Sequence, residues 1–183
     1  RKENSDSNVL IITFSTNIKI QSKTDGAIVF SVDWFDGPDE LPILWTTATG
    51  VLPIETWVHV AVTYDATSFS NDAIIYINGA AVSVTETSLT GGDSFVGITG
   101  GGSSPCVIGS ILTGDFFNGH LAEMSIWNRV LTATEVAEIY NAGIVSGLTD
   151  VLESTKTNLQ LWYRMGEGFD TRSKFYDSSE NGK

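Results

Sequence analysis

The sequence predicts an all-β protein, a two-layer antiparallel jelly-roll sandwich with one short capped helix. Val, Ile, Thr and aromatic residues recur in short runs between turns, and 18 glycines punctuate them. Asn78-Gly79 joins two such runs as a hairpin turn would. A single segment, residues 133–142, has a helical pattern. One helix among about ten strands favours a sandwich over an α/β fold.

The first third of the chain predicts extended segments. Asp25-Gly26 supplies a turn between two of them, and residues 33–42 (DWFDGPDELP) are rich in Gly, Pro and acids, which predicts a loop. Short apolar runs predict strands over residues 9–14, 18–20, 27–32 and 43–45.

Residues 57–64 form the clearest predicted strand. Val58, Val60 and Val62 lie on one face with Tyr64, and the opposite face is also largely apolar, so we expect a central strand covered on both sides. Trp57, which begins this segment, is then expected to be a core aromatic. Residues 73–77 and 81–84 predict the two arms of a hairpin around Asn78-Gly79, with a type I′ turn.

Residues 91–104 are glycine-rich but lack the GxxxxGK[ST] pattern of a phosphate-binding loop. Beyond them, residues 107–108 and 121–127 predict strands. The helix follows, with Thr132 as N-cap and Glu135 three residues on as the partner in a capping box. Leu131 and Val136 occupy the hydrophobic staple positions, and Gly143 is the expected stop.

Several motifs occur together in a familiar order. They are residues 57–65 (WVHVAVTYD), 75–79 (IYING), 107–109 (VIG), 117–123 (FNGHLAE) and 127–131 (WNRVL). Together they resemble the laminin-G-like / concanavalin-A-like lectin and glucanase superfamily, of a bacterial or phage type. The resemblance implies the jelly-roll fold and a choice of functions: lectin-like carbohydrate binding, binding of another surface ligand, or glucanase activity.

The last 25 residues resemble the segment that opens such domains, notably residues 159–168 (LQLWYRMGEG) and 177–182 (DSSENG). We therefore expect a jelly-roll domain over residues 1–158 and a tail over 159–183 packed in the same sandwich. Leu159, Leu161, Tyr163 and Met165 would form one apolar face of a strand. The alternative is that the tail opens a second repeat.

The net charge of −12 argues against nucleic-acid binding, which needs a basic surface. No apolar run approaches 18 residues, so membrane insertion is not expected. Cys106 is the only cysteine, so no internal disulfide can form.

Sugar binding needs an exposed aromatic ring beside polar groups. Trp34 and Phe35, flanked by Asp33 and Asp36, are the first candidates, and Trp45 is the second. Trp127 is better explained as a core residue. The alternative for Trp34 is partial burial under its loop.

The sequence does not favour an enzyme. Related glucanases use an ExDxE strand pattern, which is absent, and there is no GxSxG motif. His59 and His120 are isolated, so packed or hydrogen-bonded histidines are expected rather than a metal site.

The resemblance implies a calcium site, since many relatives bind Ca²⁺ through oxygen ligands at the rim of the sandwich. The matching positions are Asp177, Asn181 and Glu123. Two positions depart from the family pattern: Ala122 stands where Asp is common and Glu180 where Gly is common. An Asx-type turn at Asp177 and a solvated Glu123 is the alternative explanation.

These observations lead to a non-catalytic recognition module that binds glycans or another surface ligand within a larger extracellular or virion protein. The alternative is a structural or decoration domain of a phage virion or surface assembly, making protein–protein contacts with other domains or subunits. A glycosidase is the third and least favoured hypothesis. We expect the protein outside the cell, at a cell surface or on a virion.

Overall fold

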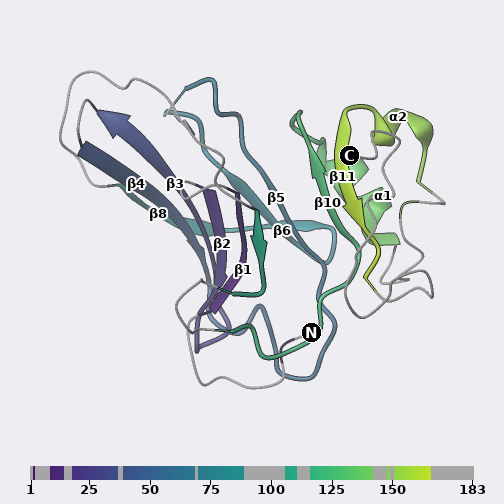
Figure 1. Ribbon diagram of the computed structural model, residues 1–183, viewed down its shortest axis with the longest axis horizontal. Coiled ribbons are helices and arrows are strands. Elements are labelled where there is room, and N and C mark those ends of the chain that lie inside the picture. Colours follow the sequence, from purple (N-terminus) through teal and green to yellow (C-terminus); the bar gives the residue numbers. More distant parts are fainter. Residues whose placement is uncertain are drawn as a thin grey trace.

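The computed structural model describes residues 2, 9–14, 18–36, 39–68, 70–88, 106–110, 116–141, 148 and 151–165. These residues form antiparallel sheets and two short helices, which confirms the all-β sandwich (Figure 1). The largest sheet has six strands in the order β8-β4-β3-β2-β1-β9. Its strands are β1 (Val9–Phe14), β2 (Ile18–Ser22), β3 (Ile28–Asp36), β4 (Asp39–Thr47), β8 (Val84–Ser88) and β9 (Val107–Ile108).

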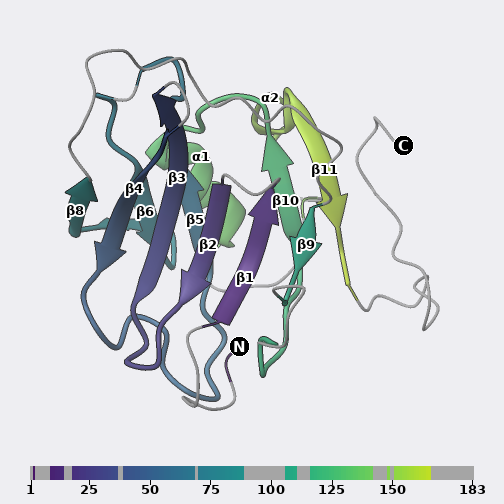
Figure 2. The ribbon, with the colours of Figure 1, turned by 60° about the vertical axis from the view of Figure 1, so that its left-hand side comes forward.

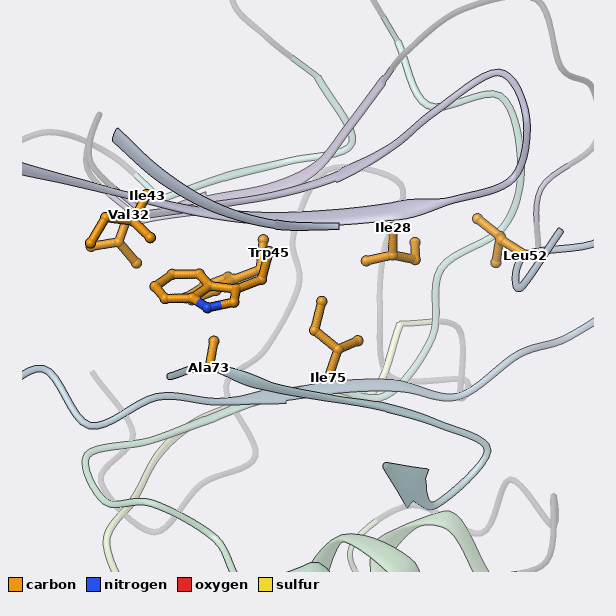
Figure 3. Close-up of a cluster of buried hydrophobic side chains, with 8 residues drawn as sticks. Ile28, Val32, Ile43, Trp45, Leu52, Ala73 and Ile75 are labelled. Atoms are coloured by element: carbon orange, nitrogen blue, oxygen red, sulfur yellow. The ribbon is translucent and has the colours of Figure 1, made fainter. Parts of the chain in front are cut away.

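The second layer is the three-stranded sheet β5-β6-β7, formed by β5 (Val60–Thr63), β6 (Ile74–Ile77) and β7 (Ala80–Val82). The main core lies between the two sheets. Figure 3 shows apolar side chains of β3 and β4 facing Ala73 and Ile75 of the opposite layer. The predicted inner face of residues 58–64 is confirmed, because Val58, Val60 and Val62 pack against this core.

The predicted loop over residues 33–42 is wrong. β3 extends to Asp36 and β4 begins at Asp39, and the two strands are paired throughout, with Asp36 opposite Asp39. The long ladder of backbone hydrogen bonds outweighs the unfavourable strand propensities of the acidic residues and proline.

The hairpin between β6 and β7 agrees with the prediction. Asn78 and Gly79 both have positive φ, 51° and 77°, as a type I′ turn requires. The turn lies against helix α1 (Ala133–Tyr140), since a Cβ added to Gly79 would come within 2.8 Å of the Tyr140 ring. Glycine is therefore needed here both for its backbone conformation and for close packing.

Helix α1 (Ala133–Tyr140) has the predicted capping box, with both reciprocal bonds between Thr132 and Glu135. Leu131 and Val136 share a buried cluster with Tyr76 of β6, so α1 covers the outer face of the second sheet. The helix ends earlier than predicted. Asn141 adopts the left-handed conformation at the C-cap, with φ of 45°, whereas Gly143 lies outside the described residues.

The C-terminal part contains β10 (Met124–Trp127), helix α2 (Glu153–Lys156) and β11 (Leu159–Tyr163). β11 pairs antiparallel with β10, and Figure 2 shows the two strands side by side. The predicted apolar face of β11 is wrong in part. A register shift leaves Gln160 unpaired, so Leu159 is buried together with Trp162, while Leu161 and Tyr163 are only partly buried.

Polar contacts fasten this segment to the domain. The guanidinium of Arg129 donates to the backbone oxygens of Ser154, Thr155 and Thr157 at 3.3, 3.0 and 2.9 Å. From α1, the Glu138 carboxylate accepts bonds from the Leu152 amide and the Thr155 hydroxyl at 2.6 and 2.7 Å. The chain around α2 is therefore held at both of its ends.

Candidate ligand-binding surface

Trp45 is not an exposed platform, as the sequence suggested, but a core residue. It is 1% exposed, and its ring lies 5.7 Å from that of Phe30 and 5.2 Å from that of Tyr64. The reason is its register in β4, where Trp45 shares the inward face with Ile43 (Figure 3). It therefore cannot stack on a ligand.

Asp33 is also unsuited to ligand binding. It is 7% exposed, and one carboxylate oxygen lies 2.8 Å from the Lys19 Nζ on the neighbouring strand. Trp34, Phe35 and Asp36 close β3 next to it, but their side chains lie outside what the structure describes. Their role in binding stays a prediction.

Among the tryptophans whose side chains the structure describes, the exposed one is Trp57, and its predicted place in the core is wrong. It is 49% exposed, because β5 begins only at Val60 and Trp57 precedes it outside the sheets.

Backbone contacts bring a distant segment beside Trp57. Lys2 bridges to Ile54 on one side and to Gly119 on the other, and the Glu55 amide donates to the Lys2 oxygen at 2.7 Å. His120 follows Gly119, and its ring centroid lies 6.3 Å from that of Trp57 at an angle of 41°. Lys2 itself is buried, with its Nζ donating to the Lys23 oxygen at 2.8 Å.

We call this region the Trp57–His120 surface. It is made of the exposed residues Ile54, Glu55, Thr56, Trp57 and His120. It offers an aromatic face, an aliphatic side chain and several hydrogen-bonding groups, which is the combination that sugar-binding sites use. Sequence reasoning missed it because its two halves lie more than sixty residues apart in the chain.

The other histidine is packed, as the sequence predicted. His59 lies 5.7 Å from the Tyr140 ring, centroid to centroid, and burial lowers the pKa of its imidazole. In the described part of the chain, no three His, Cys, Asp or Glu side chains gather as a metal site would require.

One pair of carboxyl groups deserves comparison with a glycosidase. A hydrogen bond with Asp72 raises the pKa of Glu86, and burial and charge repulsion add to the effect. A glycosidase holds its carboxyls about 5–9.5 Å apart so that the glycosidic bond fits between them. Asp72 and Glu86 bond directly to each other and both are exposed, so they leave no such room.

Of the three residues expected to bind calcium, the structure describes Glu123. Its carboxylate accepts a bond from the Trp162 Nε1 at 2.7 Å and lies 3.9 Å from the Arg164 Nε. Arg164 also stands over the Trp162 ring, 5.3 Å from its centroid. Asp177 and Asn181 lie outside the described residues, so the calcium site stays a prediction.

Comparison with known proteins agrees with this architecture. A family model described as the concanavalin A-like lectin/glucanases superfamily matches residues 1–137, well over half of the chain and including both Trp57 and His120. The chain therefore belongs to this superfamily. No curated protein and no solved structure matches it. Among the residues described, no helix has the length and apolar character needed to cross a membrane.

Proposed function

We propose that this domain is a non-catalytic recognition module that binds glycans through the Trp57–His120 surface. The observation that carries the proposal is the half-exposed Trp57 ring with the His120 imidazole 6.3 Å away. Sugars present an apolar face of C–H groups that stacks on such rings, and hydroxyls that hydrogen-bond to neighbouring polar groups. Lectins are among the members of the superfamily.

The contrast with the other tryptophans whose side chains the structure describes supports this choice. Trp45 and Trp162 are buried, and Trp127 is partly buried, with its Nε1 donating to the Thr155 oxygen at 2.9 Å. Keeping a large side chain out of the core forgoes about 1.5–3 kcal/mol of stabilisation. An exposed aromatic beside another apolar side chain, Ile54, is typical of a binding surface.

A glycan array tests the proposal, with Trp57→Ala beside the wild type. We expect binding to at least one glycan and a loss of roughly tenfold or more in Trp57→Ala. Leu152→Ala is the matched control, because Leu152 is 64% exposed and belongs to another part of the domain. Undiminished binding by Trp57→Ala would refute this surface, and an array without any binding would refute glycan recognition.

A structural role in a surface assembly or virion is the second candidate. Exposed apolar side chains away from the proposed site, Val130 and Leu152, support it, because such side chains also occur at protein–protein contacts. An array without binding, together with self-association that Leu152→Ser abolishes, would favour this role. Both proposals place the domain outside the cell or on a virion.

A further inference from the structure

We infer that the Trp57–His120 surface continues along residues 116–120 as a strip that takes an extended, neutral oligosaccharide. The inference rests on the proposed glycan recognition and adds the length and charge of the ligand. Its basis is an alternation in exposure. Phe116, Asn118 and His120 are exposed, whereas Phe117 and Gly119 between them are partly buried.

This segment is fixed by backbone contacts near both ends. Phe116 pairs with Ser110, and the Phe117 amide donates to the Gly109 oxygen at 2.7 Å. Gly119 pairs with Lys2, the residue that also holds Ile54. The alternation of exposed and partly buried residues is the pattern of an extended chain, which directs every second side chain to the same side, so we place the three exposed residues in one row.

The row is longer than a single sugar ring. At about 3.3 Å per residue of extended chain, Phe116 and His120 are separated by about 13 Å, and the Trp57 ring lies 6.3 Å from that of His120. Its chemistry combines the two kinds of group that bind a chain of sugars. Phe116 and Trp57 offer apolar rings, while the Asn118 amide and the His120 imidazole can both donate and accept hydrogen bonds.

The exposure of Phe116 strengthens the argument. It is 69% exposed, the highest value among the large apolar residues of the described chain. Covering such a ring with a ligand would recover much of the free energy of burying an aromatic side chain. A site for one terminal sugar at Trp57 would leave Phe116 unused.

Charge determines which sugars fit. Residues 54–57 and 116–120 contain no Lys or Arg, and Glu55 adds a carboxylate next to Trp57. The protein carries a net charge of −12, which repels anionic chains. The strip is therefore suited to neutral sugars and not to uronic acid or sulfated chains.

Isothermal titration with cello-, xylo- and malto-oligosaccharides, each from monosaccharide to hexasaccharide, tests the inference. Oligogalacturonides of the same lengths serve as the charged comparison. For one neutral series we expect the affinity to rise roughly tenfold or more with length. Phe116→Ala should remove most of that rise, and Leu152→Ala should leave it in place.

The outcomes distinguish the extended strip from glycan recognition at the Trp57–His120 surface. Binding that needs Trp57 but is indifferent to length and to Phe116→Ala would refute the strip and leave glycan recognition standing. Tighter binding of oligogalacturonides would refute its preference for neutral chains. Failure of all three neutral series to bind would overturn the inference, while the glycan array decides the proposed function on its own.

Discussion

Arg129 offers the sharpest test of how the C-terminal segment is held. Its guanidinium forms two bonds to the Glu135 carboxylate, at 3.0 and 2.6 Å, and three to backbone oxygens of residues 154, 155 and 157. The planar guanidinium thus joins the capping residue of α1 to the end of α2. We predict that Arg129→Met destabilises the domain.

The magnitude follows from these bonds. A hydrogen bond to a charged group contributes about 1.5–3 kcal/mol, but the bonds of one guanidinium are not additive and Arg129 is partly exposed. We therefore expect a loss of about 2–4 kcal/mol in the free energy of unfolding, measured by urea denaturation. Arg129→Lys should lose an intermediate amount, because an ammonium cannot reproduce the planar fork.

A second measurement makes the prediction specific. The Arg129 hydrogen bond, helped by the Thr132 amide, lowers the pKa of Glu135 to about 2. In Arg129→Met this pKa should rise toward its ordinary value of 4.5, as an NMR titration would show. The control is Lys156→Met, which removes an exposed ion pair with Glu153 and should cost less than about 1 kcal/mol. Equal stability of Arg129→Met and Lys156→Met would refute the reasoning.

Three further predictions concern the tail, the buried histidine and calcium. Deleting residues 155–183 removes β11 with its buried Leu159 and Trp162, so we expect the free energy of unfolding to fall by about 3–6 kcal/mol or the domain to fail to fold. An unchanged urea midpoint would contradict the packing of β11 in the domain. Burial lowers the pKa of His59, so the unfolded chain binds its proton more readily, and stability that is fully present above pH 6.5 should fall as the pH drops below 6.5; His59→Phe should flatten this part of the urea profile. If the calcium site exists, Ca²⁺ at about 100 times its dissociation constant should raise the free energy of unfolding by about 2.7 kcal/mol, and a chelator should reverse this gain. Glu123→Gln should abolish the gain, and equal melting temperatures with Ca²⁺ and with chelator would refute the site.

Local signals in the sequence predicted most of the fold. The capping box at Thr132 and the turn at Asn78-Gly79 depend on a few adjacent residues, and both formed as expected. Features set by the partner strand were less predictable. The pairing of β3 with β4 through Asp36 and the register shift at Gln160 depend on hydrogen bonds to another strand, which composition does not reveal.

The candidate surface was harder to predict than the fold. Trp34 was the first candidate for ligand binding because it is an aromatic residue between acids in a predicted loop. Trp57 was expected to be buried because it begins a valine-rich run. Whether a tryptophan faces the core or solvent depends on where its strand begins and on what lies opposite. Trp57 precedes β5, and Lys2 bridges to Ile54 and Gly119 beside it, which are contacts between distant segments that no local pattern reports.

The most direct test of glycan recognition at Trp57 is an NMR titration that follows the indole N–H signals of the five tryptophans. Single substitutions assign the signals, and the glycan chosen from the array is then added. We predict that the Trp57 signal shifts with ligand while that of the buried Trp45 stays in place. A shift of the Trp34 signal with an unmoved Trp57 would contradict the account and place the ligand at the β3–β4 hairpin.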